Sequence, residues 1–344
     1  MRRRDGLAAR PVSRHLPRLG PVALAVAVGV MAALIRYGAF PAAGTPPGRA
    51  APAGEVAPAE APPADAPPAD TPAPSPRLVL SQTTVDQGGL AVLTVLPPPG
   101  YQLAGARATG WNPAPQFFRL GEGYTGLVAA PYETRPGTYR VDVSARLKGG
   151  RNEALTAPGS VELTVRYKRF TESRIYVDQR TSDLRYDPQG GRDLATIIRI
   201  RSRSNPEPLW HGPFLRPAAG EVTTQFGEIE YVNDVEDGRH SGVDIANEEG
   251  TPVAAANDGV VVLAQKLVMT GNTVIIDHGL GVFSSYSHLS AMSARTGDTI
   301  ARGQVIGRMG STGFSTGSHL HWNVTVGSTP TDPWPLVSDG LLGR

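Results

Sequence analysis

The sequence predicts an all-β protein with two successive β domains behind a proline-rich spacer. From residue 77 onward, short runs of alternating apolar residues are separated by glycine, proline and asparagine. The last third of the chain has no convincing apolar repeat of helical period. The 40 glycines and 32 prolines among 344 residues indicate many turns and at least one extended segment. This length allows two domains of about 100–200 residues each.

Residues 1–40 read as an export signal. Arginines at positions 2, 3, 4, 10, 14 and 18, against a lone Asp5, precede the apolar segment 21–35. An apolar core of about 14 residues fits a signal peptide and is short for a membrane span of about 20 residues. We expect either a cleaved signal peptide or an uncleaved signal-anchor with its arginine-rich end in the cytoplasm.

Residues 41–76 form a spacer rich in proline and alanine, with the sequence APPAD repeated at 61–65 and 66–70. Such a segment buries too little apolar surface to fold, so we expect a disordered linker. Its proline density favours polyproline II, with a reach on the order of 100 Å at about 3.1 Å per residue.

Residues 77–167 predict a small immunoglobulin-like β-sandwich. They contain about seven strand-like runs with turn residues between them, which is the pattern of this fold. The run PGTYRVDV, with Tyr139 just after a turn, is typical of a late strand of such a domain. No cluster of His, Asp or Glu occurs here, so we expect a role in spacing or docking.

A charged connector, residues 168–210, joins this sandwich to a second β domain at 211–344. Within the connector, residues 193–203 predict either a strand or one short helix, and the pattern does not choose between them. The final domain consists of strand-like runs such as NTVIIDHG and GVFSSYSHL, with glycine between nearly every pair.

Charge and cysteine content exclude several functions. The formal charge is only +2, and much of the positive excess lies in the first twenty residues, so we expect no nucleic-acid partner. The chain has no cysteine, which excludes disulfides and thiolate chemistry. A metal site must therefore use His, Asp and Glu.

Histidines of the final domain carry the candidate chemistry. The sequence HSGVD places His240 four residues before Asp244, and its Gly242 argues against a helix, so we expect a tight turn entering a strand. In SHLHW, His319 and His321 share one face of a strand.

Together these residues fit a zinc site. Catalytic zinc takes three protein ligands and leaves a fourth position for water. His240, Asp244 and either His319 or His321 supply that set, and spacing alone does not choose between the paired histidines. The other paired histidine and His288, in SYSHLS, remain free to act on water or substrate.

Three blocks in this order, HSGVD, SYSHLS and GRMGSTGFSTGSHLHW, resemble the lysostaphin and LytM type of zinc endopeptidase over residues 211–336. The resemblance implies a LytM-like antiparallel sheet with one Zn²⁺ per chain, bound by His240, Asp244 and His321. It implies His288 and His319 as the catalytic histidines, without deciding which is the general base.

Other residues near these blocks are expected to be bystanders. His278 and His211 are interpreted as structural. Asn323 stands where relatives often carry an acidic residue; we expect it on the strand face opposite the two histidines, without effect on the chemistry.

The implied function is hydrolysis of cross-link or stem peptides of bacterial peptidoglycan in the periplasm or cell envelope. The N-terminal segment would add a membrane contact if it is uncleaved. One alternative is a catalytically silent regulator or wall-binding protein, but such relatives lack metal ligands, and all five motif residues are present here. A second alternative is a protease for glycine-rich proteins.

Overall fold

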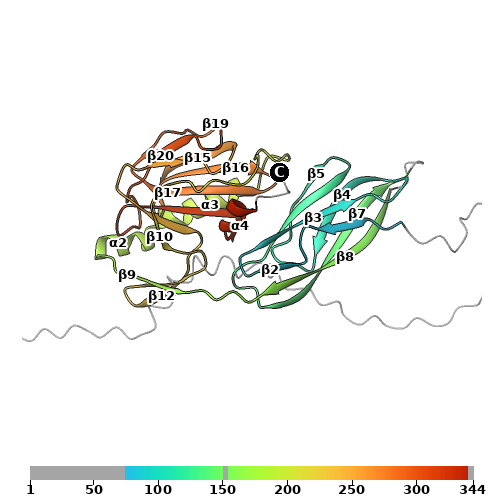
Figure 1. Cartoon of the computed structure of the whole chain (residues 1–344), viewed down its shortest axis with the longest axis horizontal. Coiled ribbons are helices and arrows are strands. Elements are labelled where there is room, and N and C mark those ends of the chain that lie inside the picture. The colour runs from blue at the N-terminus through green and yellow to red at the C-terminus, as the bar shows by residue number, and fades with distance from the viewer. Residues whose placement is uncertain (1–73, 150–153, 340–344) are drawn as a thin grey trace, which may run out of the picture. The chain divides into compact units, whose positions relative to one another are not determined.

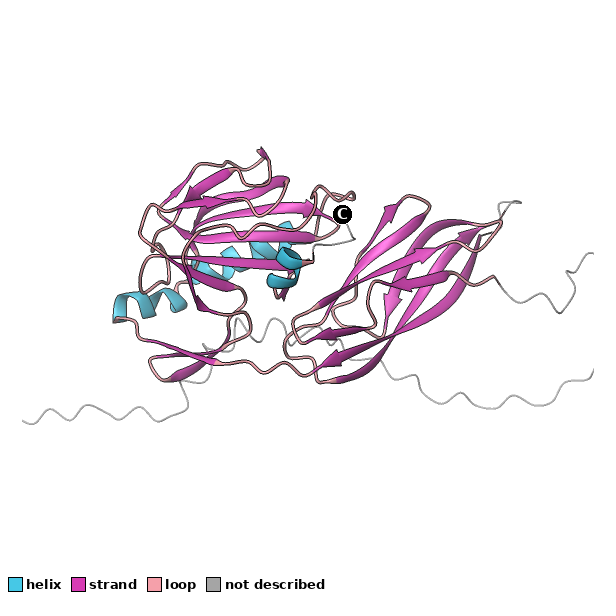
Figure 2. Ribbon diagram, viewed as in Figure 1, coloured by secondary structure: helices cyan, strands magenta, loops and turns pink. Residues whose placement is uncertain are grey.

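The computed structural model describes residues 74–149 and 154–339, and these consist mainly of strands (Figures 1 and 2). The expected all-β class is therefore confirmed. The predicted signal or anchor at 1–40, and the spacer up to residue 73, lie outside the described residues. Within the two described ranges, no helix is both long and apolar enough to cross a membrane.

Residues 77–166 form a sandwich of two four-stranded sheets. Its strands are β1 (Arg77–Leu80), β2 (Thr84–Asp86), β3 (Leu90–Leu96), β4 (Gln102–Thr109), β5 (Phe117–Leu120), β6 (Gly123–Ala129), β7 (Gly137–Lys148) and β8 (Ala154–Arg166). One sheet has the order β1-β3-β6-β5 and the other β2-β8-β7-β4. These orders correspond to the two sheets of an immunoglobulin fold, as the sequence predicts.

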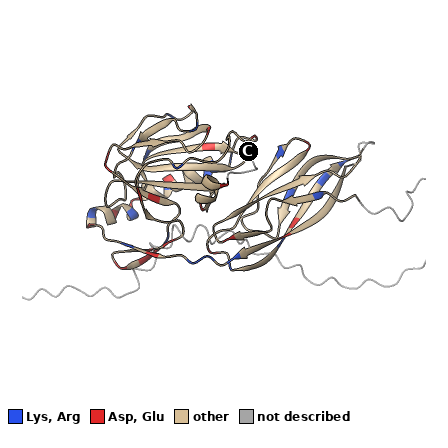
Figure 3. Ribbon diagram, viewed as in Figure 1, with Lys and Arg blue, Asp and Glu red and all other residues tan. Residues whose placement is uncertain are grey.

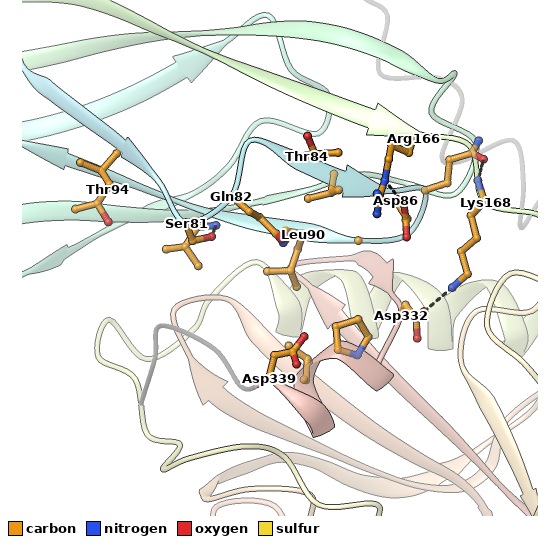
Figure 4. Close-up of a pocket in the computed structure, with 17 residues that line it drawn as sticks. Ser81, Gln82, Thr84, Asp86, Leu90, Thr94, Arg166, Lys168, Asp332 and Asp339 are labelled. Atoms are coloured by element: carbon orange, nitrogen blue, oxygen red, sulfur yellow. Dashed lines mark hydrogen bonds and ion pairs between the residues drawn. The ribbon is translucent and has the colours of Figure 1, made fainter.

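Tyr139 forms the corner that characterises this fold. On β7, its hydroxyl donates to the carbonyl of Arg135, four residues upstream, at 2.7 Å. Trp111 packs edge-on against the Tyr139 ring at a centroid distance of 5.4 Å. At the sandwich edge, Arg166 on β8 pairs with Asp86 on the parallel strand β2 at 2.8 Å (Figure 4). The hydrogen bond from Tyr139 to Arg135 ties the turn before β7 to the strand itself.

The C-terminal domain is built on one mixed-length sheet with the order β10-β13-β21-β17-β16-β15-β19, and β22 pairs with β21. Its strands are β10 (Glu221–Thr224), β13 (Val243–Ala246), β15 (Gly259–Leu267), β16 (Gly271–Gly279), β17 (Val282–Leu289), β19 (Thr299–Ile300), β21 (His319–Val326) and β22 (Thr329–Thr331). A second sheet contains β14 (Pro252–Ala254), β20 (Val305–Arg308) and β18 (Ala291–Met292), and the short helix α4 (Trp334–Ser338) follows.

The segment 168–210 contributes elements to this domain. Strand β9 (Glu172–Ile175) pairs in parallel with β11 (Ile229–Val232), which forms a hairpin with β12 (Val235–Arg239). The helices α2 (Gln179–Asp183), η1 (Leu184–Tyr186) and α3 (Pro188–Arg201) follow β9. The alternative left open at 193–203 is thus decided for a helix.

Local signals start α3 at a defined residue. Asp187 is its N-cap, and the side chain accepts from the backbone N–H of Gln189 at 2.8 Å. Pro188 occupies the first turn, where its missing N–H costs no helical hydrogen bond. Farther along, Asp193 accepts from the backbone N–H of Val268 at 2.8 Å, which ties the helix to the end of β15.

Apolar side chains cover both faces of the central sheet. The larger cluster includes Ile245, Tyr286, Leu320 and Trp322, each fully buried. On the other face, Ile197 and Ile200 of α3 pack against a buried cluster of Leu263, Leu267, Ile275 and Phe283. Tertiary burial therefore stabilises α3 despite its two internal glycines at 190 and 191.

Phe283→Ala should test the packing of α3. The ring is fully buried, so its loss should lower the free energy of unfolding by about 3–5 kcal/mol. Ile198→Ala, at an exposed position of α3, is the control and should change the free energy of unfolding by less than about 0.5 kcal/mol. Urea unfolding followed by tryptophan fluorescence measures both. Equal effects of the two substitutions would contradict the described packing.

Candidate metal centre

Three adjacent strands align the candidate residues on one sheet face. In the antiparallel pairing of β13 with β21, Asp244 lies directly opposite His321. In the pairing of β17 with β21, Ser287 lies opposite His321, and His288 follows it on β17. Because directly opposed residues point to the same face, the two histidines of β21 and Asp244 converge.

His240 reaches the same place from the loop after β12. Its backbone N–H donates to the carbonyl of Glu228 at 2.9 Å, and its carbonyl accepts from Gly227 at 2.8 Å. The loop then presses onto β21 at Gly242, where an added Cβ would lie 2.3 Å from the carbonyl oxygen of Trp322. Only glycine allows this approach, so the expected turn into a strand is confirmed.

Three candidate ligand atoms lie about 3 Å from one another. His240 Nε2 lies 3.0 Å from Asp244 Oδ1, His321 Nδ1 lies 2.9 Å from that oxygen, and the two nitrogens are 2.9 Å apart. Tetrahedral zinc with bonds of about 2.0–2.1 Å requires donor separations of about 3.3 Å. The donor set and its spacing therefore fit a zinc ion after a shift of a few tenths of an ångström.

In His240 and His321, the ring nitrogen that faces away from Asp244 also has a contact that orients the ring. His240 Nδ1 lies 3.1 Å from the carbonyl of Gln225, to which it donates, and this leaves Nε2 as the free lone pair. His321 Nε2 lies 3.5 Å from Ser241 Oγ, which leaves Nδ1 facing the other ligands. The two imidazoles thus present opposite ring nitrogens toward the same point.

The cluster is strongly coupled electrostatically. Burial opposes protonation of His240, but the charge and hydrogen bond of Asp244 outweigh it and raise the pKa of His240 to about 9. Burial would raise the pKa of Asp244, yet the adjacent His240 and His321 hold it well below its usual value. Burial lowers the pKa of His321. Metal binding must therefore displace a proton from the His240–Asp244 pair.

His288 and His319 stand beside these ligands with their rings 4.7 Å apart. His288 Nδ1 contacts the carbonyl of Thr312 at 2.8 Å, and His319 Nδ1 contacts that of Gly317 at 2.9 Å. Each Nε2 is consequently free to exchange a proton. His319 Nε2 lies 3.9 Å from Asp244 Oδ1.

His288 is held in an unusual backbone conformation. Its φ of 62° lies in the left-handed region, which costs a non-glycine residue about 1–3 kcal/mol. Its backbone N–H donates to Thr270 at 2.8 Å, which helps maintain that conformation. Burial, followed by the charges of His319 and His321, lowers the pKa of His288 to about 3, so its imidazole is neutral near pH 7.

The glycine-serine loop before β21 is anchored to its neighbours. Gly313, at φ +81°, approaches so closely that a Cβ would lie 2.4 Å from the backbone nitrogen of Gly271. The N–H of Phe314 donates to Met269 at 2.8 Å. Arg185 of η1 lies over the Phe314 ring at 4.6 Å and pairs with Asp237 of β12 at 2.7 Å.

Arg185 was not found from the sequence, and only the frequency of arginine in the connector could have drawn attention to it. It joins strand β12, which precedes His240, to the loop that precedes His319. Basic and acidic residues are otherwise interspersed over the described chain (Figure 3).

The remaining histidines of this domain lie outside the cluster. His278 is fully buried: Nδ1 contacts the carbonyl of Asp258 at 2.6 Å and Nε2 contacts Ser284 Oγ at 2.7 Å. His211 is exposed and pairs with Asp258 at 2.8 Å. The pocket drawn in Figure 4 includes none of the five site residues.

The expectation for Asn323 was wrong. Two residues beyond His321 on β21, it lies on the same sheet face as both histidines, opposite Ser285 of β17. Its side-chain nitrogen donates to the carbonyl of Ser241, inside the HSGVD loop. The physical reason is the two-residue period of a strand, which turns Leu320 and Trp322 to the other face.

Comparison with known proteins identifies the domain. Residues 238–333 match the model of a family described as Peptidase family M23. This segment is an M23 peptidase domain. The family and its named relatives class it with the metalloendopeptidases, a group of hydrolases.

The M23 domain resembles two curated relatives. It is 45% identical over 94 residues to the DD-carboxypeptidase/endopeptidase Mpg of Neisseria meningitidis. It is 42% identical over 93 residues to the peptidoglycan DD-endopeptidase ShyA of Vibrio cholerae. Each match covers 27% of this chain and 22% of the relative's length.

The similarity of structure extends beyond the M23 domain. A putative peptidase M23 from Pseudomonas aeruginosa is similar with a TM-score of 0.53 and 25% sequence identity. That match covers 75% of this chain and 96% of the solved one.

His278 should make stability depend on pH. Burial lowers its pKa from about 6.5 in the unfolded chain to about 4 in the fold, so the unfolded state binds more protons between these values. The stability that neutral His278 contributes is therefore present above pH 6.5 and is lost as the pH falls toward 4.

His278→Gln tests this in metal-free protein by urea unfolding at pH 7, 6 and 5. At pH 7 the wild type should have the higher free energy of unfolding. The difference between wild type and His278→Gln should narrow by at most about 1.4 kcal/mol per pH unit on acidification. A stability difference between the two proteins that stays constant from pH 7 to pH 5 would contradict a buried, neutral His278.

Proposed function

We propose that this protein is a zinc-dependent endopeptidase acting on the peptides of bacterial peptidoglycan. One observation carries the proposal: donor atoms of His240, Asp244 and His321 converge beside two histidines whose Nδ1 atoms contact backbone carbonyls. The M23 match supports the same reaction class.

His240 Nε2, Asp244 Oδ1 and His321 Nδ1 would hold the ion, one per chain. When bound, zinc lowers the pKa of its water to about 7 and polarises the scissile carbonyl. Gln225 and Ser241 orient the two ligand imidazoles through their outer nitrogens.

His288 and His319 would carry the proton transfers. With Nδ1–H donated to a backbone carbonyl, each presents Nε2 as a proton acceptor. One would accept the proton of the attacking water at Nε2, and the other, when protonated at Nε2, would donate that N–H to the developing oxyanion. The carbonyls of Thr312 and Gly317 fix both rings, so these groups need little reorganisation during the reaction.

Peptidoglycan as substrate is supported by the names of the relatives, one a peptidoglycan DD-endopeptidase and one a DD-carboxypeptidase/endopeptidase. We extend to this chain the action on cross-link or stem peptides. Action outside the cytoplasm, in the periplasm or cell envelope, follows from that substrate and from the basic and apolar pattern of residues 1–40. With an uncleaved segment, the spacer at 41–76 would let the enzyme reach the wall from the membrane.

The silent-regulator alternative requires the loss of a ligand or a catalytic histidine. All five residues are present, and each of the two ligand histidines has a second contact that orients its ring. This arrangement favours the enzyme.

Zinc content should separate ligands from catalytic histidines. The purified chain should hold close to one zinc, as measured by plasma emission spectrometry. His321→Ala should lose it, because two remaining ligands bind weakly. His319→Ala, on the same strand face, is the matched control and should keep the metal while losing hydrolysis. Zinc retained by His321→Ala would overturn the ligand assignment.

Digestion of defined muropeptides tests the substrate. Mass analysis of products should show cleavage of one peptide bond type, abolished by chelator and restored by Zn²⁺. His288→Ala should reduce the rate by about 10²–10⁴-fold, the usual contribution of a positioned proton-transfer group. Cleavage that persists in chelator is the outcome incompatible with this function.

A further inference from the structure

A chain of polar contacts leads from helix α3 to the HSGVD loop behind the metal centre. It begins at Arg201, in the last turn of α3, whose Nη2 donates to Ser285 Oγ at 2.7 Å and to Asn323 Oδ1 at 3.4 Å. It continues from Asn323 Nδ2 to the carbonyl oxygen of Ser241. Ser241 follows His240 directly and contacts His321 through Oγ.

The partners of Asn323 specify an amide at this position. One end of the side chain must accept from a guanidinium, and the other must donate to a backbone carbonyl. An aspartate of the same size could accept from Arg201 but would face the Ser241 carbonyl with a second oxygen. An alanine would leave the carbonyl and the guanidinium without these partners.

Arg201 has no counter-ion in the described part of the chain. Its Nε is buried without a hydrogen-bond partner, and burial is the only influence on its pKa among the described residues. Burial lowers the pKa of Arg201 to about 10, so it stays charged at neutral pH. The C-terminal end of α3, together with Ser285 and Asn323, offers the dipoles that compensate this charge.

The stability of the fold therefore does not explain why these polar residues occupy these positions. Replacing a buried charge and its polar partners by apolar residues is often neutral or stabilising. Through Asn323, the chain of contacts reaches the loop between two of the proposed metal ligands. That loop is already pressed against β21 at Gly242, so a small displacement of Ser241 would move His240 relative to His321.

We propose that Asn323 is a positioning residue of the metal centre, holding the His240–Asp244 loop at the correct distance from His321, and that Arg201 of α3 orients its amide. This inference rests on the proposed zinc site. It makes zinc affinity depend on a helix that contributes no ligand.

Zinc affinity of the full chain tests the proposal, measured by competition with a chromophoric chelator. Asn323→Asp should weaken zinc binding by about 10–100-fold, the usual effect of losing an outer contact to a metal site. The free energy of unfolding of the metal-free variant should be unchanged or higher, because the introduced carboxylate could pair with Arg201. The absorption spectrum of bound Co²⁺ should change, since its ligand geometry changes.

Asn257→Asp is the matched control. Asn257 is also buried, and its amide donates to the carbonyls of Gly212 and Pro213, away from the ligands. This variant should lose stability yet bind zinc within about twofold of the wild type, because its contacts do not reach the metal loop. A purely structural role for Asn323 predicts the same result for both substitutions.

Two further variants keep the proposal testable if Asn323→Asp does not fold. Asn323→Ala should weaken zinc binding about tenfold, and Arg201→Met should weaken it less than Asn323→Asp, because the amide can still donate to Ser241. Wild-type zinc affinity in Asn323→Asp or Asn323→Ala overturns the positioning role. A wild-type chain that binds no zinc overturns the proposed function instead, so the two failures are distinct.

Discussion

The antiparallel pairing of β13 with β21 is the constraint on which the site depends. It sets Asp244 opposite His321, and the next pairing, β17 with β21, brings His288 to the same end. A slip of one residue would turn the histidines of β21 into the core and expose Leu320 and Trp322. Burial of those apolar side chains on one face therefore fixes the register that gathers polar side chains on the other.

Asp244 is the electrostatic centre of that polar face. Its Oδ1 lies about 3 Å from nitrogens of both His240 and His321, and its negative charge outweighs the effect of burial on the pKa of His240. Without an ion, the carboxylate keeps His240 protonated; with one, the same oxygen becomes a ligand. The rings of His288 and His319 are instead oriented by backbone carbonyls.

Residues 168–210 are part of the architecture that positions this site. Strand β9 extends the hairpin from which His240 emerges, and Arg185 lies between that hairpin and the loop before His319. Helix α3 packs on the sheet face that also carries the site, and its last turn places Arg201 beside Asn323. Segments without any ligand thus determine how rigidly the ligands are held.

The sequence by itself determined the all-β class and the sandwich, because strand period and turn residues are local properties. The blocks that carry His240, Asp244, His288, His319 and His321 were assigned through their resemblance to a known family. The hydrogen bond that makes Tyr139 a tyrosine corner appeared only in the tertiary structure. The sequence left the helix at 193–203 undecided, because its short apolar pattern is stabilised only by packing on Leu263 and Phe283. Tertiary structure alone decided which groups Asn323 contacts, the contact of Arg185 with Phe314, and which ring nitrogens meet at Asp244. These depend on contacts between segments far apart in the chain, such as Arg185 with Phe314, which no local pattern records.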